Sequence, residues 1–198
     1  IENNQFAPEH TTTRAQLVTI LYRLEGQPAV TGESGFTDVE ADTWYTDAVV
    51  WAAANGIVNG VSDTRFAPGE EITRQQMAAI LYRYAEAKGY DVTDSADLSG
   101  HPDAETIQAY AQIPMAWACA QGLLQGFEDD TLRPAGNATR AQIATILMRF
   151  CQTVAQKDSA VRPKRIAPTG ALLFPCWGRF LLTGLACCGI MGPSHTTE

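Results

Sequence analysis

The sequence predicts an all-α fold of tandem helix–loop–helix repeats, and two observations carry this prediction. The phrase Thr-Arg-x-Gln occurs at residues 13–16, 73–76 and 139–142, so its copies lie 60 and 66 residues apart. Self-similarity at this spacing is typical of repeat architectures. Each phrase is also followed by apolar residues at helical spacing. A single helix pair cannot bury its own apolar face, so we expect the repeats to pack on one another around one core.

The repeated phrase itself predicts the start of a helix. A Thr followed three residues later by Gln forms a capping box, in which the two side chains satisfy free N–H groups of the first turn. We therefore expect helices to begin at or next to Thr13, Thr73 and Thr139. Equivalent apolar residues of these helices should meet in one core, namely Ile20, Ile80 and Ile146.

A second helix is expected upstream of the phrase in the later copies. Residues 43–55 have apolar residues at helical spacing, and Gly56 is a suitable C-cap. The counterpart covers residues 105–121, where Pro114 should kink or break the helix.

These landmarks divide the chain into four parts. Residues 1–30 hold the second half of a first repeat, residues 31–92 a second repeat and residues 93–156 a third. The chain opens at Ile1 rather than Met, which indicates a fragment or processed product. Residues 157–198 form an extension whose apolar stretch, 171–192, is long enough for a membrane span. Its Pro, Gly and Arg residues also fit a non-native or poorly structured tail, so membrane contact stays open.

The charge balance excludes nucleic acid as a partner. The whole chain has a net charge of −8, and residues 1–156 carry nine basic against twenty acidic side chains, a net −11. Proteins that bind nucleic acid gain most of their affinity by neutralising phosphates with Lys and Arg, which an acidic domain does not do.

The arginine of each phrase is the main candidate for ligand binding. Arg14, Arg74 and Arg140 occupy the first helical position, where the helix dipole disfavours a cation by roughly 0.3–1 kcal/mol. A guanidinium beside spare helix N–H groups makes a strong anion site. Either a ligand anion or an internal carboxylate could fill it. A second set, nine residues on, should face the opposite side as caps or salt-bridge partners: Arg23, Arg83 and Arg149.

Neither metal nor catalytic chemistry is indicated. Five Cys and three His have no ligand spacing, and we interpret Cys119 and Cys151 as small buried residues. No nucleophile or acid/base pair recurs or clusters, so we expect no enzyme activity and no cofactor.

The ordered motifs resemble the S-layer homology (SLH) repeat of bacterial cell-surface proteins. The resemblance covers roughly residues 1–154 and is most complete in the second copy. The third copy departs most, with Leu98-Ser99-Gly100-His101 in place of its first motif. The matching segments are Phe36-Thr37-Asp38-Val39, Trp44, Gly56-Ile57-Val58-Asn59-Gly60, Asp63-Thr64-Arg65-Phe66-Ala67-Pro68 and Ile72-Thr73-Arg74-Gln75-Gln76.

The resemblance implies a pseudo-threefold helical bundle, with a truncated first repeat and one incomplete groove. Such a module sits outside the cell and anchors a larger surface protein to peptidoglycan-linked wall polysaccharide, often through a pyruvate ketal. It assigns ligand binding to Arg14, Arg74, Arg140, Asp38, Trp44, Gln76 and Gln142. Trp44 could instead be a core residue and Asp38 a local cap. The alternative function is an α-helical module for protein–protein interaction.

Overall fold

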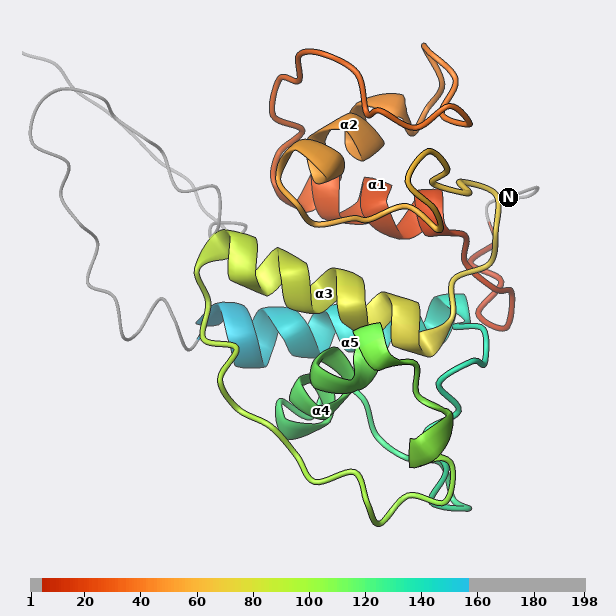
Figure 1. Ribbon diagram of the computed structural model, residues 1–198, viewed down its shortest axis with the longest axis vertical. Coiled ribbons are helices and arrows are strands. Elements are labelled where there is room, and N and C mark those ends of the chain that lie inside the picture. The colour runs from red at the N-terminus through yellow and green to blue at the C-terminus, as the bar shows by residue number, and fades with distance from the viewer. Residues whose placement is uncertain (1–4, 157–198) are drawn as a thin grey trace, which may run out of the picture. The chain divides into compact units, whose positions relative to one another are not determined.

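Five α-helices carry the fold in the computed structural model, which describes residues 5–156 (Figure 1). Their bounds are Arg14–Leu24 for α1, Thr46–Ala54 for α2, Arg74–Lys88 for α3, Gln112–Ala120 for α4 and Arg140–Phe150 for α5. The all-α prediction is confirmed, since the only β pairing in the described residues consists of isolated bridges. The predicted extension 157–198, with its apolar stretch, lies outside the described residues.

The capping boxes are present at all three predicted positions. Thr13, Thr73 and Thr139 are the N-caps of α1, α3 and α5. Each Thr side chain accepts a hydrogen bond from the third helical amide, and the Gln side chain at that position accepts one from the cap amide. The prediction of helix starts from this phrase is therefore confirmed.

The upstream helix of the third repeat is shorter than expected. Two 3-10 turns, Ala104–Thr106 and Ala109–Ala111, precede α4, so the helix does not run from residue 105. Pro114 falls in the first turn of α4, where an amide has no intrahelical partner to lose. The proline therefore sits near the start of this helix and does not break it.

Helices pair across repeat boundaries rather than within a repeat. The upstream helix α2 packs along α1 of the preceding repeat, and α4 packs along α3 in the same way. The Tyr22 ring of α1 meets Trp51 of α2 at 5.7 Å between centroids. The second repeat thus supplies α2 to the pair before it and α3 to the pair after it.

A closed ring of backbone hydrogen bonds joins the three copies of the phrase. The Thr12 amide donates to Ala138 O at 3.1 Å, the Ala138 amide to Ile72 O at 2.9 Å, and the Ile72 amide back to Thr12 O at 2.8 Å. All three residues are buried. Because equivalent residues bond in a cycle, the copies are related as three units about a common centre.

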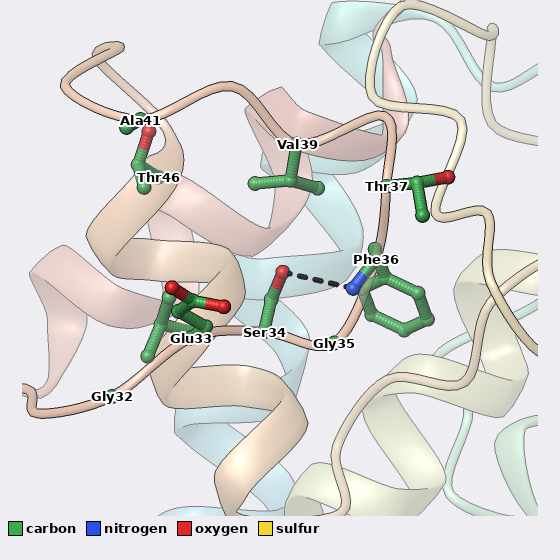
Figure 2. Close-up of a pocket in the computed structure, with 10 residues that line it drawn as sticks. Gly32, Glu33, Ser34, Gly35, Phe36, Thr37, Val39, Ala41 and Thr46 are labelled. Atoms are coloured by element: carbon green, nitrogen blue, oxygen red, sulfur yellow. Dashed lines mark hydrogen bonds between the residues drawn. The ribbon is translucent and has the colours of Figure 1, made fainter.

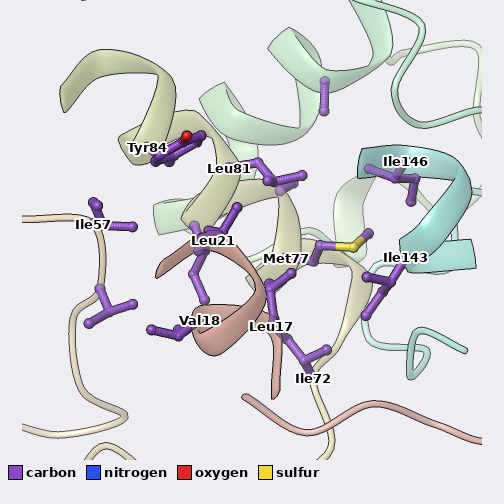
Figure 3. Packing of buried hydrophobic residues seen from close by; sticks show 14 of the residues in the cluster. Leu17, Val18, Leu21, Ile57, Ile72, Met77, Leu81, Tyr84, Ile143 and Ile146 are labelled. Carbon is purple, nitrogen blue, oxygen red and sulfur yellow. The ribbon is translucent and has the colours of Figure 1, made fainter. Parts of the chain in front are cut away.

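The core collects apolar side chains from all three second helices (Figure 3). Leu17 and Leu21 of α1 face Met77 and Leu81 of α3, and residues of α5 close the cluster. The expectation for the equivalent isoleucines is wrong in one copy: Ile80 and Ile146 are 3% and 4% exposed, but Ile20 is 40% exposed.

The exposure of Ile20 follows from what covers its equivalents. Ile80 shares a cavity with Asn59, Gly60 and Val61, and Ile146 shares one with Leu123 and Leu124. The described part of the first repeat contains no counterpart of these upstream segments, so Ile20 is left uncovered there.

Candidate functional site

Two grooves recur at equivalent positions of the second and third repeats. The Arg14 groove is a cavity of about 410 Å³ whose wall combines three repeats. It is lined by Arg14, Asn59, Gly60, Val61, Gln76, Ala79, Ile80, Arg83, Gln108 and Tyr110. The Arg74 groove is a cavity of about 220 Å³. It is lined by Arg74, Leu123, Leu124, Gln125, Ala141, Gln142, Thr145, Ile146 and Arg149.

Both grooves are basic although the domain is acidic. Each contains two arginines and no Asp or Glu in its wall. The Tyr110 hydroxyl lies close enough to Arg14 and Arg83 for both guanidinium groups to affect its pKa. Burial raises the pKa of Tyr110, against the opposing effect of the two guanidinium groups. The grooves therefore present positive charge and hydrogen-bond donors to an incoming group.

The arginine of the phrase reaches from one repeat into the next. Arg14 Nε donates to Phe66 O at 2.8 Å and its Nη2 to Asn59 O at 3.2 Å. The side chain is 4% exposed, and its guanidinium lies 4.8 Å from the centre of the Phe66 ring. Burial lowers the pKa of Arg14, because the charged form loses water.

Arg74 repeats this arrangement one unit further on. Its Nε donates to Leu132 O at 2.7 Å and its Nη2 to Gln125 O at 3.1 Å. Leu132 has no aromatic ring, and the Phe127 ring takes its place, with its centre 4.8 Å from the Arg74 guanidinium. Neither Arg14 nor Arg74 forms an ion pair within residues 5–156, so their internal partners are carbonyl groups and not the carboxylate considered from sequence.

Arg140 makes the equivalent contact with less burial. Its Nε donates to Phe6 O at 2.8 Å, and its guanidinium lies 5.2 Å from the centre of the Phe6 ring. Arg140 is half-buried and Phe6 is 54% exposed. This third position is therefore more open than the other two in the described part of the chain.

The helix N-termini do not supply the spare amides that the sequence suggested. The amides of Arg14 and Ala15 donate to Glu70 O and Pro68 O of the next repeat. Equivalent bonds hold the starts of α3 and α5, and the third amide of each helix bonds to its Thr cap. The expectation that free helix amides bind an anion is therefore wrong. The first two N–H groups of each helix bond to another repeat, and the third bonds to its own cap.

The second arginines correct another expectation. Arg83 lines the same groove as Arg14, and Arg149 lines the same groove as Arg74, so they are not remote from the candidate site. The two arginines of one helix do point to different sides. However, Arg14 acts in the groove of the following repeat, where it meets the second arginine of that repeat. Sequence spacing within one helix could not reveal this contact between repeats.

Gln76 and Gln142 line the grooves as well as capping their helices. The Oε1 atom of each accepts a hydrogen bond from the cap Thr amide. Only the Nε2 amide group therefore remains as a donor toward the cavity.

Asp38 is positioned away from both grooves. Its two carboxylate oxygens accept hydrogen bonds from the amides of Phe66 and Ala67, at 2.8 and 2.7 Å. Burial acts to raise the pKa of Asp38, but these backbone bonds outweigh it and hold the pKa below the ordinary value. Asp38 thus holds the loop that accepts the Arg14 hydrogen bond.

Asp103 is the counterpart of Asp38 in the third copy. Its oxygens accept from the amides of Leu132 and Arg133 at 2.8 and 2.7 Å, as Asp38 does in the second copy. His101 stands where the second copy has Phe36. A Cβ placed on Gly60 would lie 2.8 Å from the Phe36 ring, and one on Gly126 would lie 3.3 Å from the His101 ring. The third copy therefore has this motif with His101-Pro102-Asp103 in place of Phe36-Thr37-Asp38.

Trp44 lies on the surface. It is 60% exposed and packs edge-on against Tyr45 at 5.1 Å between centroids, so the alternative that it belongs to the core is wrong. Its repeat equivalent is Tyr110, which is 44% exposed and lines the Arg14 groove.

A further cavity, of about 440 Å³, differs in chemistry (Figure 2). The loop 32–41 and helix α2 enclose it, and the Phe36 amide donates to Ser34 Oγ at its edge. Glu33 is its one ionisable lining residue, and no arginine lines it. A carboxylate without a cation disfavours an anionic ligand here.

The described residues give no sign of a metal centre. Within residues 5–156, no three His, Cys, Asp or Glu side chains gather closely enough to hold an ion. Cys119 and Cys151 are half-buried free thiols, and burial raises the pKa of each. None of the helices in the same range combines the length and apolarity that a bilayer crossing needs.

Known proteins resemble about three quarters of this chain. A surface-layer 125 kDa protein of Lysinibacillus sphaericus is 35% identical over 77% of this chain, and the match covers 13% of that protein. An endoglucanase of Bacillus sp. (strain KSM-635) is 31% identical over 77% of this chain and 16% of its own length. A cellulosome-anchoring protein of Acetivibrio thermocellus is 27% identical over 73% of this chain and 33% of its own length.

The matches cover only a fraction of each relative. The chain spans between 13% and 33% of these three relatives, so the match does not extend to most of each protein. Residues 35–78 and 102–144 match the family description "S-layer homology domain". With the repeated phrase, the capping boxes and the ring of bonds between copies, this match identifies the two segments as S-layer homology repeats.

Proposed function

We propose that residues 5–156 form a non-catalytic module that anchors a larger surface protein by binding an acidic, peptidoglycan-linked wall polysaccharide in its inter-repeat grooves. The family places the repeats at the bacterial cell surface. Catalysis is not indicated, because the endoglucanase relative shares only 16% of its length with this chain.

The observation that carries the proposal is the pair of arginines in each groove. Among the nineteen acidic side chains in the described residues 5–156, none lines either groove, while four of the nine basic side chains do. Buried guanidinium groups with donors to spare attract a carboxylate, and charge-assisted hydrogen bonds are stronger than neutral ones. Exposed Tyr110 offers the planar apolar surface on which a sugar ring can lie.

The site assignment carried into the proposal differs from the one made on sequence. Arg14, Arg74, Gln76 and Gln142 remain as groove residues, and Arg83, Arg149 and Tyr110 join them. Arg140 and Trp44 belong to a third position, between the first repeat and its neighbours. Asp38 serves as a positioning residue, because its carboxylate holds the loop rather than the ligand. We also propose that residues 5–30 are half of a repeat, which the ring of bonds supports.

The test is co-sedimentation of the full chain with peptidoglycan sacculi. Sacculi that retain their covalently attached polysaccharide should pull the protein down, and sacculi stripped of it by mild acid should not. Reduced sedimentation in high salt is also expected, because the contacts are ionic. Equal binding to both preparations would contradict the polysaccharide as ligand. Failure to bind either would favour the alternative, a module for protein–protein interaction.

A further inference from the structure

The two grooves have arginines at the same repeat positions, but the second arginines of the two grooves make different contacts. In the Arg74 groove, Arg149 is already occupied: its Nη2 lies 3.3 Å from Gln125 Oε1 and its Nη1 3.5 Å from Leu123 O. In the Arg14 groove, the side chain of Arg83 forms no hydrogen bond or ion pair with any residue of the described range 5–156. The Arg83 guanidinium is therefore left available to a ligand.

One sequence difference accounts for the missing side-chain partner of Arg83. The position of Gln125 in the third repeat is held by Asn59 in the second. Asn has one methylene fewer than Gln, and no bond from Asn59 to Arg83 is formed among the described residues. The side-chain bond between Arg149 and Gln125 therefore has no counterpart at Arg83 among the described residues.

The grooves also differ in completeness. The Arg14 groove receives a fourth wall, Gln108 and Tyr110, from the following repeat. The described residues provide no such wall for the Arg74 groove, whose cavity is about 220 Å³ against about 410 Å³. Nor do they give the first repeat a counterpart of Asn59 and Gly60. Within residues 5–156, only the Arg14 groove therefore has every wall, rather than all but one groove as the sequence suggested.

We propose that the Arg14 groove is the ligand-selecting groove of this chain, with Arg83 as its specificity-determining residue. Arg83 pairs with the carboxylate of an acidic sugar whose ring lies against Tyr110. This inference rests on the proposed function, since it names the groove and the residue through which that function is exercised. In the Arg74 groove, the second arginine already makes two internal hydrogen bonds, and none of the described lining residues is aromatic. This groove therefore contributes much less to binding.

The test uses calorimetric titration of the full chain with a defined probe. The probe is the methyl glycoside of an N-acetylhexosamine bearing a 4,6-linked pyruvate ketal, and its uncharged carboxyl methyl ester is the reference. We expect one site per chain for the acid and little binding of the ester. Arg83→Ala should weaken binding about tenfold to a hundredfold, and Arg149→Ala, its matched control, by less than about threefold.

Two further variants guard against misfolding as an explanation. Arg83→Met keeps the apolar stem and should weaken binding as Arg83→Ala does, with an unchanged melting curve. Asn59→Gln leaves Arg83 in place but supplies the partner that Gln125 gives to Arg149. It should weaken binding roughly twofold to tenfold, because Arg83 would first have to give up one hydrogen bond to the Gln side chain.

The outcomes separate this inference from the function on which it rests. If the wild-type chain binds neither the acid nor the ester, both fail. If it binds both equally, the carboxylate pairing fails. If it binds the acid but Arg149→Ala costs as much as Arg83→Ala, the anchoring function stands and the selection of one groove is overturned.

Discussion

At the scale of single residues, the conserved feature of the three copies is an arginine that joins one repeat to the next. Arg14 and Arg74 each bridge two carbonyl oxygens of the following repeat from a buried position. A residue of this kind has two roles, because the same guanidinium closes the repeat interface and lines the groove. A substitution of this arginine changes the repeat interface as well as the groove, so a loss of binding in such a variant cannot be assigned to the groove alone.

Arg74→Ala should therefore destabilise the domain, by about 1–3 kcal/mol. The substitution leaves the carbonyls of Leu132 and Gln125 without their donors in a buried interface, which costs the desolvation of those groups. Urea unfolding followed by far-UV circular dichroism measures the change. Arg65→Ala is the control, since the Arg65 side chain is 60% exposed, and it should be within about 0.5 kcal/mol of wild type. Equal effects of the two variants would contradict the structural role of Arg74.

At the scale of elements, an aspartate fixes the loop that precedes each of the two later phrase helices. Asp38 holds the amides of Phe66 and Ala67, and Asp103 holds those of Leu132 and Arg133. Ala67 and Arg133 both adopt positive φ, at 58° and 50°. These non-glycine residues sit in a left-handed conformation that is costly on its own, so the aspartate bonds help to hold the loop in place.

The loop should loosen in acid, with a pH dependence set by Asp38. Its pKa lies below the ordinary 3.8 in the folded state, so its contribution to stability is fully present above pH 3.8. That contribution is lost as the pH falls through the lowered folded-state pKa. Urea unfolding of wild type and Asp38→Asn at several values between about pH 5 and 2 should show a smaller acid-induced loss in the variant. Parallel curves would show that the carboxylate bonds add no stability.

At the scale of the whole described domain, the three copies depend on one another through the cycle of bonds at Thr12, Ile72 and Ala138. The phrase helices each take loop carbonyls from the next copy, and the last takes those of the first. Long-range closure of this kind makes the domain one cooperative unit rather than a stack that can lose an end repeat.

Hydrogen exchange should reveal this closure. The amides of Thr12, Ile72 and Ala138 are buried in the ring and should exchange with one common free energy, equal to that of global unfolding. The amide of Val61, bonded to Arg65 O in an exposed turn, should exchange faster and serve as the internal reference. Under native conditions, Arg74→Ala should lower the protection of all three ring amides together. Different protection of Thr12 from the other two would show that the ring opens at the first copy.

The amino-acid sequence alone determined the repeat, its capping boxes and its helical class, because these depend on side chains a few residues apart. Thr73 and Gln76 cap one turn of one helix, and nothing distant changes that. It also pointed to Arg14 and Arg74 as special, through their repetition against the helix dipole.

Only the tertiary structure decided what those arginines contact and which groove is complete. Arg14 meets Arg83 because a side chain of one repeat extends into the next, a contact that spacing within one helix cannot reveal. Asp103 could not be recognised from the sequence because His101, two residues before it, replaces the Phe of the motif. Ile20 is exposed because the residues that would cover it come from another segment. Local rules set each helix, but the chemistry of a groove depends on side chains brought together from separate repeats.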